Sequence, residues 1–204
     1  MCDLIFGITG QTGAGKTMVS DIFRNLGVTV VDADEASKET TKKGSPCLKE
    51  IEKCFGSEFI LPSGELDRRG LGRVVFSNPD KLAKLSEITH KYIKESVTQK
   101  LSESTSKIKA IDGAVLIGSN MEEMCAFMVA VTADCDIRKE RIKLRDGLSD
   151  EDAKTRINAQ QSKEFYKNHA KYIIENNKTQ KELEQQTIVV YNQICKYRKD
   201  REFE

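Results

Sequence analysis

Short apolar runs recur along the chain, and each predicts a buried strand. They are Leu4–Ile8, the β-branched run Val28–Val31, Ile108–Gly113, Phe127–Thr132 and Tyr172–Ile174. Between them, apolar residues recur at steps of three and four, which is typical of amphipathic helices. Strands that alternate with helices predict an α/β fold with a parallel sheet of about five strands and helices on both faces.

The predicted helices differ in how clearly the sequence marks their ends. They are Lys16–Leu26, Asp134–Arg145, one that begins near Ser149, and Leu183–Tyr197. Ser149 with Asp152 three residues later resembles a capping box. The charged tail 196–204 is expected to fray. From residue 35 to about 105, helical patterns dominate over too great a length for a simple crossover, so we expect a helical insertion that closes over a substrate.

The composition excludes several classes of protein. The 204 residues include 33 Lys and Arg against 32 Asp and Glu, and the net charge is +1. The chain therefore has no excess of positive charge of the kind that nucleic-acid binding requires. The six cysteines are scattered without a C-x-x-C pair, so we expect reduced thiols in a cytoplasmic protein. No apolar run is long enough to span a membrane, and no obligate protein partner is evident. A small, charged ligand fits best.

The strongest motif directly follows the first predicted strand and precedes the first predicted helix. Residues 10–17 read G-x-x-x-x-G-K-[ST], the phosphate-binding loop, which predicts ATP as ligand. The predicted nucleotide-binding residues are Gly10, Thr12, Gly13, Ala14, Gly15, Lys16, Thr17 and Met18. Lys16 is expected to reach the β- and γ-phosphates, and the hydroxyl of Thr17 to hold Mg²⁺. A glycine-rich turn without a ligand is the alternative.

Carboxylates and arginines near this loop suggest phosphoryl transfer. Asp32 and Asp34 end the second predicted strand, where one can act as a base and the other can cap a helix or hold water on the metal. They are otherwise two solvated carboxylates. Arg141 and Arg145 share one stripe of a predicted helix with Arg138 and can hold the departing phosphates, although a solvated basic face is the usual meaning of such a stripe.

Several separated segments together resemble the dephospho-CoA kinase family. They are residues 7–17, Val30–Asp34, Phe55–Gly56, Gly64–Leu71, Val75–Phe76, Ile88–His90, Arg141–Ser149, Arg156–Ile157 with Gln160, and Ala170–Ile174 with Asn176–Asn177. The combination of D-A-D after the second strand with L-D-R-R is the most specific part. The resemblance runs from residue 4 to about 195.

This resemblance implies a nucleoside-monophosphate-kinase-like fold of one domain, with a core (1–34, 106–139, 166–204), a substrate-binding insertion (35–105) and a lid (140–165). It implies transfer of the ATP γ-phosphoryl group to the ribose 3′-hydroxyl of dephospho-CoA, with Mg²⁺ present. Asp34 matches the base on that hydroxyl, Lys16, Arg141 and Arg145 match groups that act on the phosphates, and Asp32, Arg68, Arg69 and His90 match the substrate-binding region.

The chain departs from the family pattern in three places. Ala114–Gly118 lacks the proline and the acidic residue usual after the third strand, Lys91 follows His90 where proline is frequent, and Met18 replaces a second hydroxyl residue. Two alternatives therefore stay open. One is another small-molecule kinase acting on a nucleoside or nucleotide, and the other is a nucleotide-binding regulatory protein without catalysis.

Overall fold

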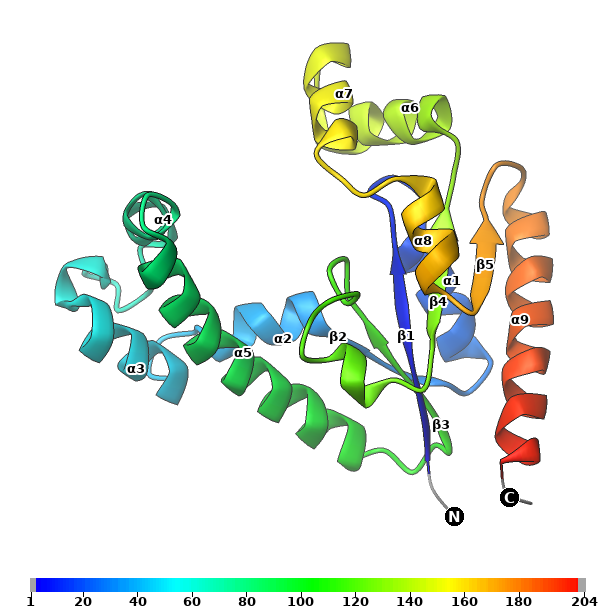
Figure 1. Cartoon of the computed structure of the whole chain (residues 1–204), viewed down its shortest axis with the longest axis horizontal. Helices are drawn as coiled ribbons and strands as arrows, with labels where there is room; N and C mark the ends of the chain where they lie inside the picture. The colour runs from blue at the N-terminus through cyan, green and yellow to red at the C-terminus, as the bar shows by residue number, and fades with distance from the viewer. Residues whose placement is uncertain (1–2, 202–204) are drawn as a thin grey trace. The chain divides into compact units, whose positions relative to one another are not determined.

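The computed structural model describes residues 3–201, which form two compact units. Of the described residues, one unit comprises 3–31 and 104–201, and the other comprises 32–103. Five strands form one sheet in the order β2-β3-β1-β4-β5 (Figure 1). Their bounds are β1 Leu4–Gly10, β2 Thr29–Asp32, β3 Ile108–Asp112, β4 Met128–Thr132 and β5 Tyr172–Glu175. β1 pairs in parallel with β3 and β4, and β4 pairs in parallel with β5, so the predicted α/β sheet is confirmed.

The first unit places helices on both faces of this sheet. Their bounds are α1 Lys16–Asn25, α6 Cys135–Asp146, α7 Asp150–Asn158, α8 Lys163–His169 and α9 Gln180–Asp200. α1 and α9 pack together over one face, and α8 packs against β4 on the other (Figure 1). The core between the sheet and α1 with α9 is mainly aliphatic, with Phe6 and Phe23 in edge-to-face contact.

The second unit is helical and has its own small core. Its helices are α2 Ala33–Thr40, α3 Pro46–Phe55, α4 Arg68–Phe76 and α5 Pro79–Ser102, with a short 3₁₀ turn at Ser57–Phe59. α5 has 24 residues, about 36 Å at 1.5 Å per residue. Cys47, Ile51, Leu71, Val75 and Ile88 pack together between α3, α4 and α5. Apolar residues at helical spacing thus explain why this segment folds as helices.

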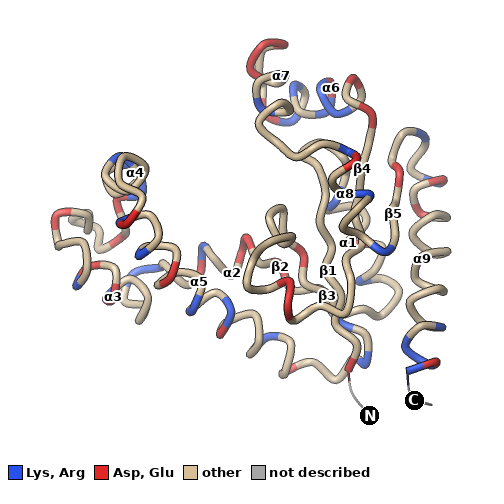
Figure 2. Tube along the Cα trace, viewed as in Figure 1, with Lys and Arg blue, Asp and Glu red and all other residues tan. Residues whose placement is uncertain are grey.

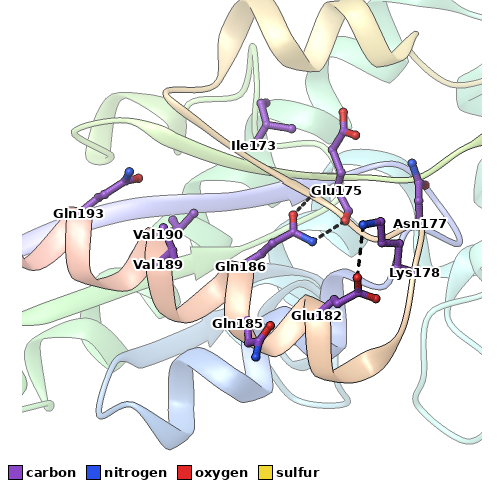
Figure 3. A pocket seen from close by; sticks show the side chains of 10 residues that line it. All are labelled: Ile173, Glu175, Asn177, Lys178, Glu182, Gln185, Gln186, Val189, Val190 and Gln193. Atoms are coloured by element: carbon purple, nitrogen blue, oxygen red, sulfur yellow. Dashed lines mark hydrogen bonds and ion pairs between the residues drawn. The ribbon is translucent and has the colours of Figure 1, made fainter.

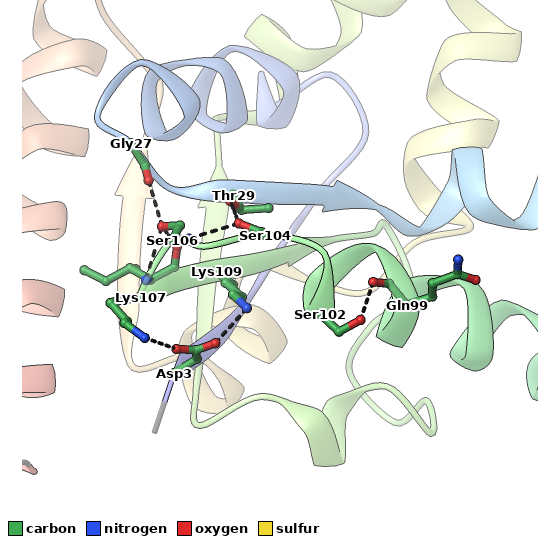
Figure 4. Close-up of polar contacts among 10 residues, drawn as sticks. Asp3, Gly27, Thr29, Gln99, Ser102, Ser104, Ser106, Lys107 and Lys109 are labelled. Atoms are coloured by element: carbon green, nitrogen blue, oxygen red, sulfur yellow. Dashed lines mark hydrogen bonds and ion pairs between the residues drawn. The ribbon is translucent and has the colours of Figure 1, made fainter. Parts of the chain in front are cut away.

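Hydroxyl groups join β2 to the segment before β3 at the end of the sheet remote from the phosphate loop. Ser106 Oγ donates to the carbonyl of Gly27 at 2.9 Å, and the hydroxyls of Thr29 and Ser104 lie 2.5 Å apart (Figure 4). The ammonium of Lys109, a buried residue of β3, lies 2.7 Å from Asp3 and lowers the pKa of that carboxyl. These contacts fix the start of β3, whose other end carries a residue of the site described below.

The free edge of β5 is covered by a side chain of α9. The Gln186 amide donates to the carbonyl of Glu175 at 3.0 Å and accepts from the Glu175 N–H at 3.2 Å (Figure 3). An amide side chain therefore satisfies both backbone groups that Glu175 would offer to a further strand. Below it, Lys178 and Glu182 pair at 3.3 Å at the start of α9.

The helix ends differ from the predictions in two places. α9 begins three residues earlier than expected, where Thr179 and Glu182 form a capping box. It also continues to Asp200, so the expectation of a frayed tail is wrong for residues 196–200. Residues 202–204 lie outside the described part. Within residues 3–201, no helix combines the length and the apolar character that crossing a bilayer requires.

Candidate functional site

The predicted phosphate loop joins β1 to α1 with a left-handed backbone at Gly13 and Gly15. Gly13 and Gly15 have φ of 76° and 94°, values that favour glycine. A Cβ at Gly15 would also lie 2.3 Å from the Asn176 amide nitrogen, so no larger residue fits there. Gly15 is the N-cap of α1, and no side chain caps that helix. The first N–H groups of α1 therefore remain available for an anion.

Three side chains from outside the loop bind three successive carbonyl oxygens of the loop. They are Arg138 Nε to Thr12 O at 2.9 Å, Arg141 Nη1 to Gly13 O at 3.4 Å, and Asn176 Nδ2 to Ala14 O at 2.8 Å. In a trans peptide the N–H points opposite to the C=O. Holding these carbonyls outward therefore turns the N–H groups of Gly13 and Gly15 inward, as a phosphate cradle requires.

Lys16 pairs with a carboxylate that the sequence analysis did not single out. Its ammonium forms an ion pair with Asp112, the last residue of β3, and Ser20 Oγ donates to the same carboxylate at 2.7 Å. Asp112 is only 3% exposed. Lys16 and Ser20 lie four residues apart, so one face of α1 presents both donors to Asp112.

Asp112 and Asn176 are therefore site residues that the sequence analysis missed. Asp112 had a usable signal, since it ends a strand beside the loop as Asp32 does. Asn176 follows β5 directly and is buried, but its bond to Ala14 spans 162 positions and has no local signature. Asn176 Oδ1 also accepts from Arg141 Nη2 at 3.3 Å, which links two of the three groups that hold the loop.

The remaining predicted nucleotide-binding residues have distinct environments. Thr17 lies in the first turn of α1 and is exposed. Met18 is 38% exposed and donates its N–H to the carbonyl of Gly15 at 3.1 Å. Thr12 donates its N–H to Gln160 Oε1 at 2.7 Å, so that N–H is already engaged within the protein. Gly10 ends β1 and lies beside β4.

Arg141 and Arg145, both predicted to act on phosphates, have different surroundings. Arg141 contacts the loop, whereas the exposed Arg145 donates through Nε and Nη2 to Asp146 at 2.8 and 2.9 Å. Arg156 of α7 pairs with the same Asp146 at 2.8 Å. Figure 2 shows charges of both signs along α6 and α7. The structure does not bring Arg145 to the loop, and its role stays a prediction.

Asp32 and Asp34 separate because the chain turns directly from β2 into α2. Asp32 is the N-cap of α2, and its Oδ1 accepts from the N–H of Glu35 at 2.9 Å. Asp34 lies in the first turn of α2 with an exposed side chain. Of the uses that the sequence left open for the two carboxylates, the structure shows the helix cap at Asp32. The role of Asp34 as a base stays a prediction.

Arg68, Arg69 and His90 belong to the same helical unit as Asp34. Arg68 begins α4, whose N-cap is Asp67, and its Nη2 donates to the hydroxyl of Thr41 at the C-terminal end of α2. Asp34 lies at the opposite end of α2, roughly 10 Å away along the helix axis. Arg69 and His90 are exposed on α4 and α5. The structure therefore does not bring Arg68 next to Asp34.

The described residues contain no group of three or more His, Cys, Asp or Glu side chains that could hold a metal ion. Mg²⁺ does not need such a group, because it is usually held by one or two protein oxygens together with phosphates and water. The hydroxyl of Thr17 and the carboxylate of Asp112 are oxygen donors of the required kind. These residues fit a metal that arrives with a nucleotide.

Comparisons with known proteins agree on one family. The family model described as dephospho-CoA kinase matches residues 4–182. A dephospho-CoA kinase of Bacillus licheniformis is 32% identical over 186 residues, which are 90% of this chain and 92% of that protein. The crystal structure of TT1252 from Thermus thermophilus has a TM-score of 0.81 at 28% identity, over 95% and 98% of the two chains. Dephospho-CoA kinase from Campylobacter jejuni has a TM-score of 0.65 at 24% identity over the same shares, which shows the shared fold.

Proposed function

We propose that this chain, which belongs to the dephospho-CoA kinase family, transfers the γ-phosphoryl group of ATP to the 3′-hydroxyl of the ribose of dephospho-CoA. The products are coenzyme A and ADP, and the reaction is the last step of coenzyme A synthesis. The family match over residues 4–182 supports the substrate. The single observation that carries the chemistry is the loop whose carbonyls are held outward by Arg138, Arg141 and Asn176.

The loop and its neighbours supply the groups that phosphoryl transfer needs. The inward N–H groups and the uncapped start of α1 bind phosphate oxygens. Lys16 places an ammonium at the same end of α1 and pairs with Asp112 until a phosphate offers it a second anionic partner. Arg141 adds a guanidinium beside Gly13. Positive groups at fixed positions stabilise the charge that spreads over the transferred group.

Mg²⁺ is the metal that this donor set suits. Thr17 and Asp112 would hold it, directly or through water, and the ion would supply neutralisation of the phosphate charge. Asp112 is suited to this task because Ser20 fixes one of its oxygens at 2.7 Å. The described residues thus support the predicted cofactor without a dedicated metal cage.

The acceptor side of the reaction rests on the helical unit. Asp34 is the proposed base that accepts the proton of the ribose hydroxyl, and its exposed position in the first turn of α2 supports this role. Arg68, Arg69, His90 and Asp32 are proposed to contribute to substrate binding from the insertion 35–105. The segment 140–165 is proposed as a lid that excludes water, with Arg145 exchanging Asp146 for a phosphate.

The cytoplasmic location expected from the sequence is part of this proposal, and the free thiols of the described cysteines support it because reduced cysteines are typical of that compartment. The protein acts on a small molecule, and the family provides no reason to invoke nucleic acid.

The test is ADP production from ATP and Mg²⁺ with and without dephospho-CoA, with adenosine, AMP and cytidine as parallel acceptors. Strong stimulation by dephospho-CoA alone, with coenzyme A as the second product, is expected. Equal or greater stimulation by one of the other acceptors would assign a different small-molecule kinase. Tight ATP binding without ADP formation for any acceptor would favour a regulatory protein and contradict the proposal.

A further inference from the structure

A second group of contacts lies behind the phosphate loop, on the side away from its inward N–H groups. Arg138 of α6 is 4% exposed, and its Nη2 donates to Gln160 Oε1 at 3.0 Å while its Nε donates to the carbonyl of Thr12. Gln160, which follows α7, accepts the N–H of Thr12 with the same oxygen at 2.7 Å. One guanidinium and one amide oxygen thus bind the peptide groups on both sides of Thr12.

The arrangement fixes the orientation of the Gln160 amide. Both neighbours of its Oε1 atom are donors, so only the oxygen fits at that position. The peptide between Gln11 and Thr12 has one further partner within the loop, because the N–H of Ala14 donates to the carbonyl of Gln11 at 3.1 Å. The peptide before Thr12 is therefore held at its N–H and its C=O. The next peptide is held at its C=O, which leaves the N–H of Gly13 as its remaining donor.

The charge at this position is unusual. Within the described residues no carboxylate pairs with Arg138, although buried arginines are usually paired. Burial lowers the pKa of Arg138, but a guanidinium stays charged at neutral pH. Gln160 supplies a neutral oxygen where a glutamate of similar size would supply a charged one. The positive charge is therefore left uncompensated directly behind the loop.

We propose that Arg138 and Gln160 form a positioning pair for the phosphate loop, in which the neutral amide orients both peptide groups of Thr12 and leaves the charge of Arg138 to act on the bound phosphates. The pair joins the end of α7, within the predicted lid, to the loop. It makes Gln160 a residue that tunes nucleotide affinity without touching the nucleotide. The proposal rests on the proposed function only in assuming that the loop binds a nucleoside triphosphate.

Two substitutions at position 160 separate the geometric part from the electrostatic part. Gln160→Met keeps the length of the side chain but removes the acceptor, so Thr12 loses one partner and Arg138 another. Gln160→Glu keeps an acceptor oxygen for both donors but cancels the charge of Arg138. Gln161→Met is the matched control, because Gln161 is the next residue and its side chain is exposed. Arg138→Lys tests the two hydrogen bonds of the guanidinium, to Thr12 O and to Gln160 Oε1, because a lysine ammonium cannot reproduce two donors in one plane.

The measurements are the dissociation constant of ADP by calorimetry, KM for ATP and for dephospho-CoA, kcat, and Tm of the full chain. For Gln160→Met we expect KM for ATP and the dissociation constant to rise about tenfold, the scale of one or two hydrogen bonds. KM for dephospho-CoA should change less than about twofold. For Gln160→Glu we expect an unchanged or higher Tm and weaker ADP binding, with the difference from wild type shrinking as salt is added.

Other results would overturn the pairing. Equal nucleotide affinity in wild type, Gln160→Met and Gln160→Glu would show that Gln160 does not position the loop. A parallel rise of both KM values together with a lower Tm in Gln160→Met would indicate a general structural role. Calorimetry with ADP needs no acceptor, so weaker binding in the variants supports the pair even if dephospho-CoA is not the substrate, and coenzyme A formation supports the function even if the variants bind normally.

Discussion

Lys16 at the start of α1 forms an ion pair with Asp112 at the end of β3, 96 positions further along the chain. Both side chains are largely buried, with 17% and 5% of their surfaces exposed. Lys16 is also the residue expected to bind the β- and γ-phosphates. A bound nucleotide would therefore offer this lysine a second anionic partner besides Asp112, and the use of Asp112 as a Mg²⁺ ligand stays a proposal.

Asp112→Asn is expected to destabilise the protein without nucleotide. Lys16 loses its counterion in a buried setting, which costs about 1–3 kcal/mol, while asparagine still accepts the hydroxyl of Ser20. Urea denaturation with and without ATP measures this effect, and ATP should recover part of the loss because Lys16 then has a phosphate partner. Asp21→Asn on α1 is the control, and it should cost less because Asp21 and its partner Arg24 are 59% and 40% exposed. Equal midpoints for Asp112→Asn and wild type would contradict the role of the pair.

Lys16→Ala is expected to lower kcat by roughly two to three orders of magnitude, the scale of one lost charge-stabilising group in the transition state. Single-turnover phosphoryl transfer measures this loss. Lys178→Ala is the matched control, because Lys178 is 72% exposed beside Glu182, and it should turn over like wild type. A Lys16→Ala enzyme with normal kcat would mean that the loop lysine does not act on the phosphates.

Asp34→Asn is expected to lower kcat by roughly two orders of magnitude, as loss of a general base does, while KM for ATP stays unchanged. The fold should not suffer, since Asp34 is exposed and the helix cap is Asp32. Steady-state kinetics and Tm together test this prediction. Glu35→Gln removes the neighbouring exposed carboxylate and serves as control. An unchanged kcat in Asp34→Asn would contradict the assignment of Asp34 as the general base.

Asp150→Asn is expected to weaken the contact between α6 and α7 in a pH-dependent way. Lys143 and Lys139 lower the pKa of Asp150 from 3.8 to about 2. A carboxyl with a depressed pKa contributes stability above its unfolded value, and the contribution disappears as the pH falls from about 4 to about 2. At pH 7 the variant should melt below wild type, and the melting temperatures should converge as the pH approaches about 2. A Tm difference that is constant from pH 7 to pH 2 would rule out the carboxylate as the cause.

The cysteine thiols are expected to react in two groups. Burial raises the pKa of Cys47 to about 11 and that of Cys125 to about 12, so neither forms the nucleophilic thiolate at neutral pH. Cys54 and Cys135 are exposed. Iodoacetamide at pH 8 should therefore modify Cys54 and Cys135 first, as followed by peptide mass mapping, and the buried Cys47 and half-buried Cys125 only after urea is added. Early modification of Cys47 in the folded protein would contradict its buried position.

The sequence predicted the parts of the molecule that local patterns encode. Apolar runs located the five strands, and the glycine spacing located the loop between β1 and α1. The side chains that hold this loop could not be predicted from local sequence patterns. Arg138 reaches Thr12 across 126 positions and Gln160 reaches it across 148, and only folding brings such partners together.

Two predictions show where local reasoning meets its limit. Arg138 was recognised as part of a basic stripe, but the spacing of three and four could not tell which arginine faces the protein and which faces water. Asp32 and Asp34 were expected at the end of a strand, and the sequence left open which of them acts as a base and which caps a helix. The turn into α2 separates them because Asp32 satisfies an N–H of the first helical turn.

The amide of Gln186 at the edge of β5 has a consequence for aggregation of the protein at high concentration. An edge strand with unsatisfied backbone groups can pair with the same strand of a neighbouring molecule, and repeated pairing of this kind builds fibrils. Here the hydrogen bonds at Glu175 are already taken by a group from the same chain. In crowded or heated solutions, Gln186 should therefore hinder the pairing of β5 with a strand of a neighbouring molecule at Glu175.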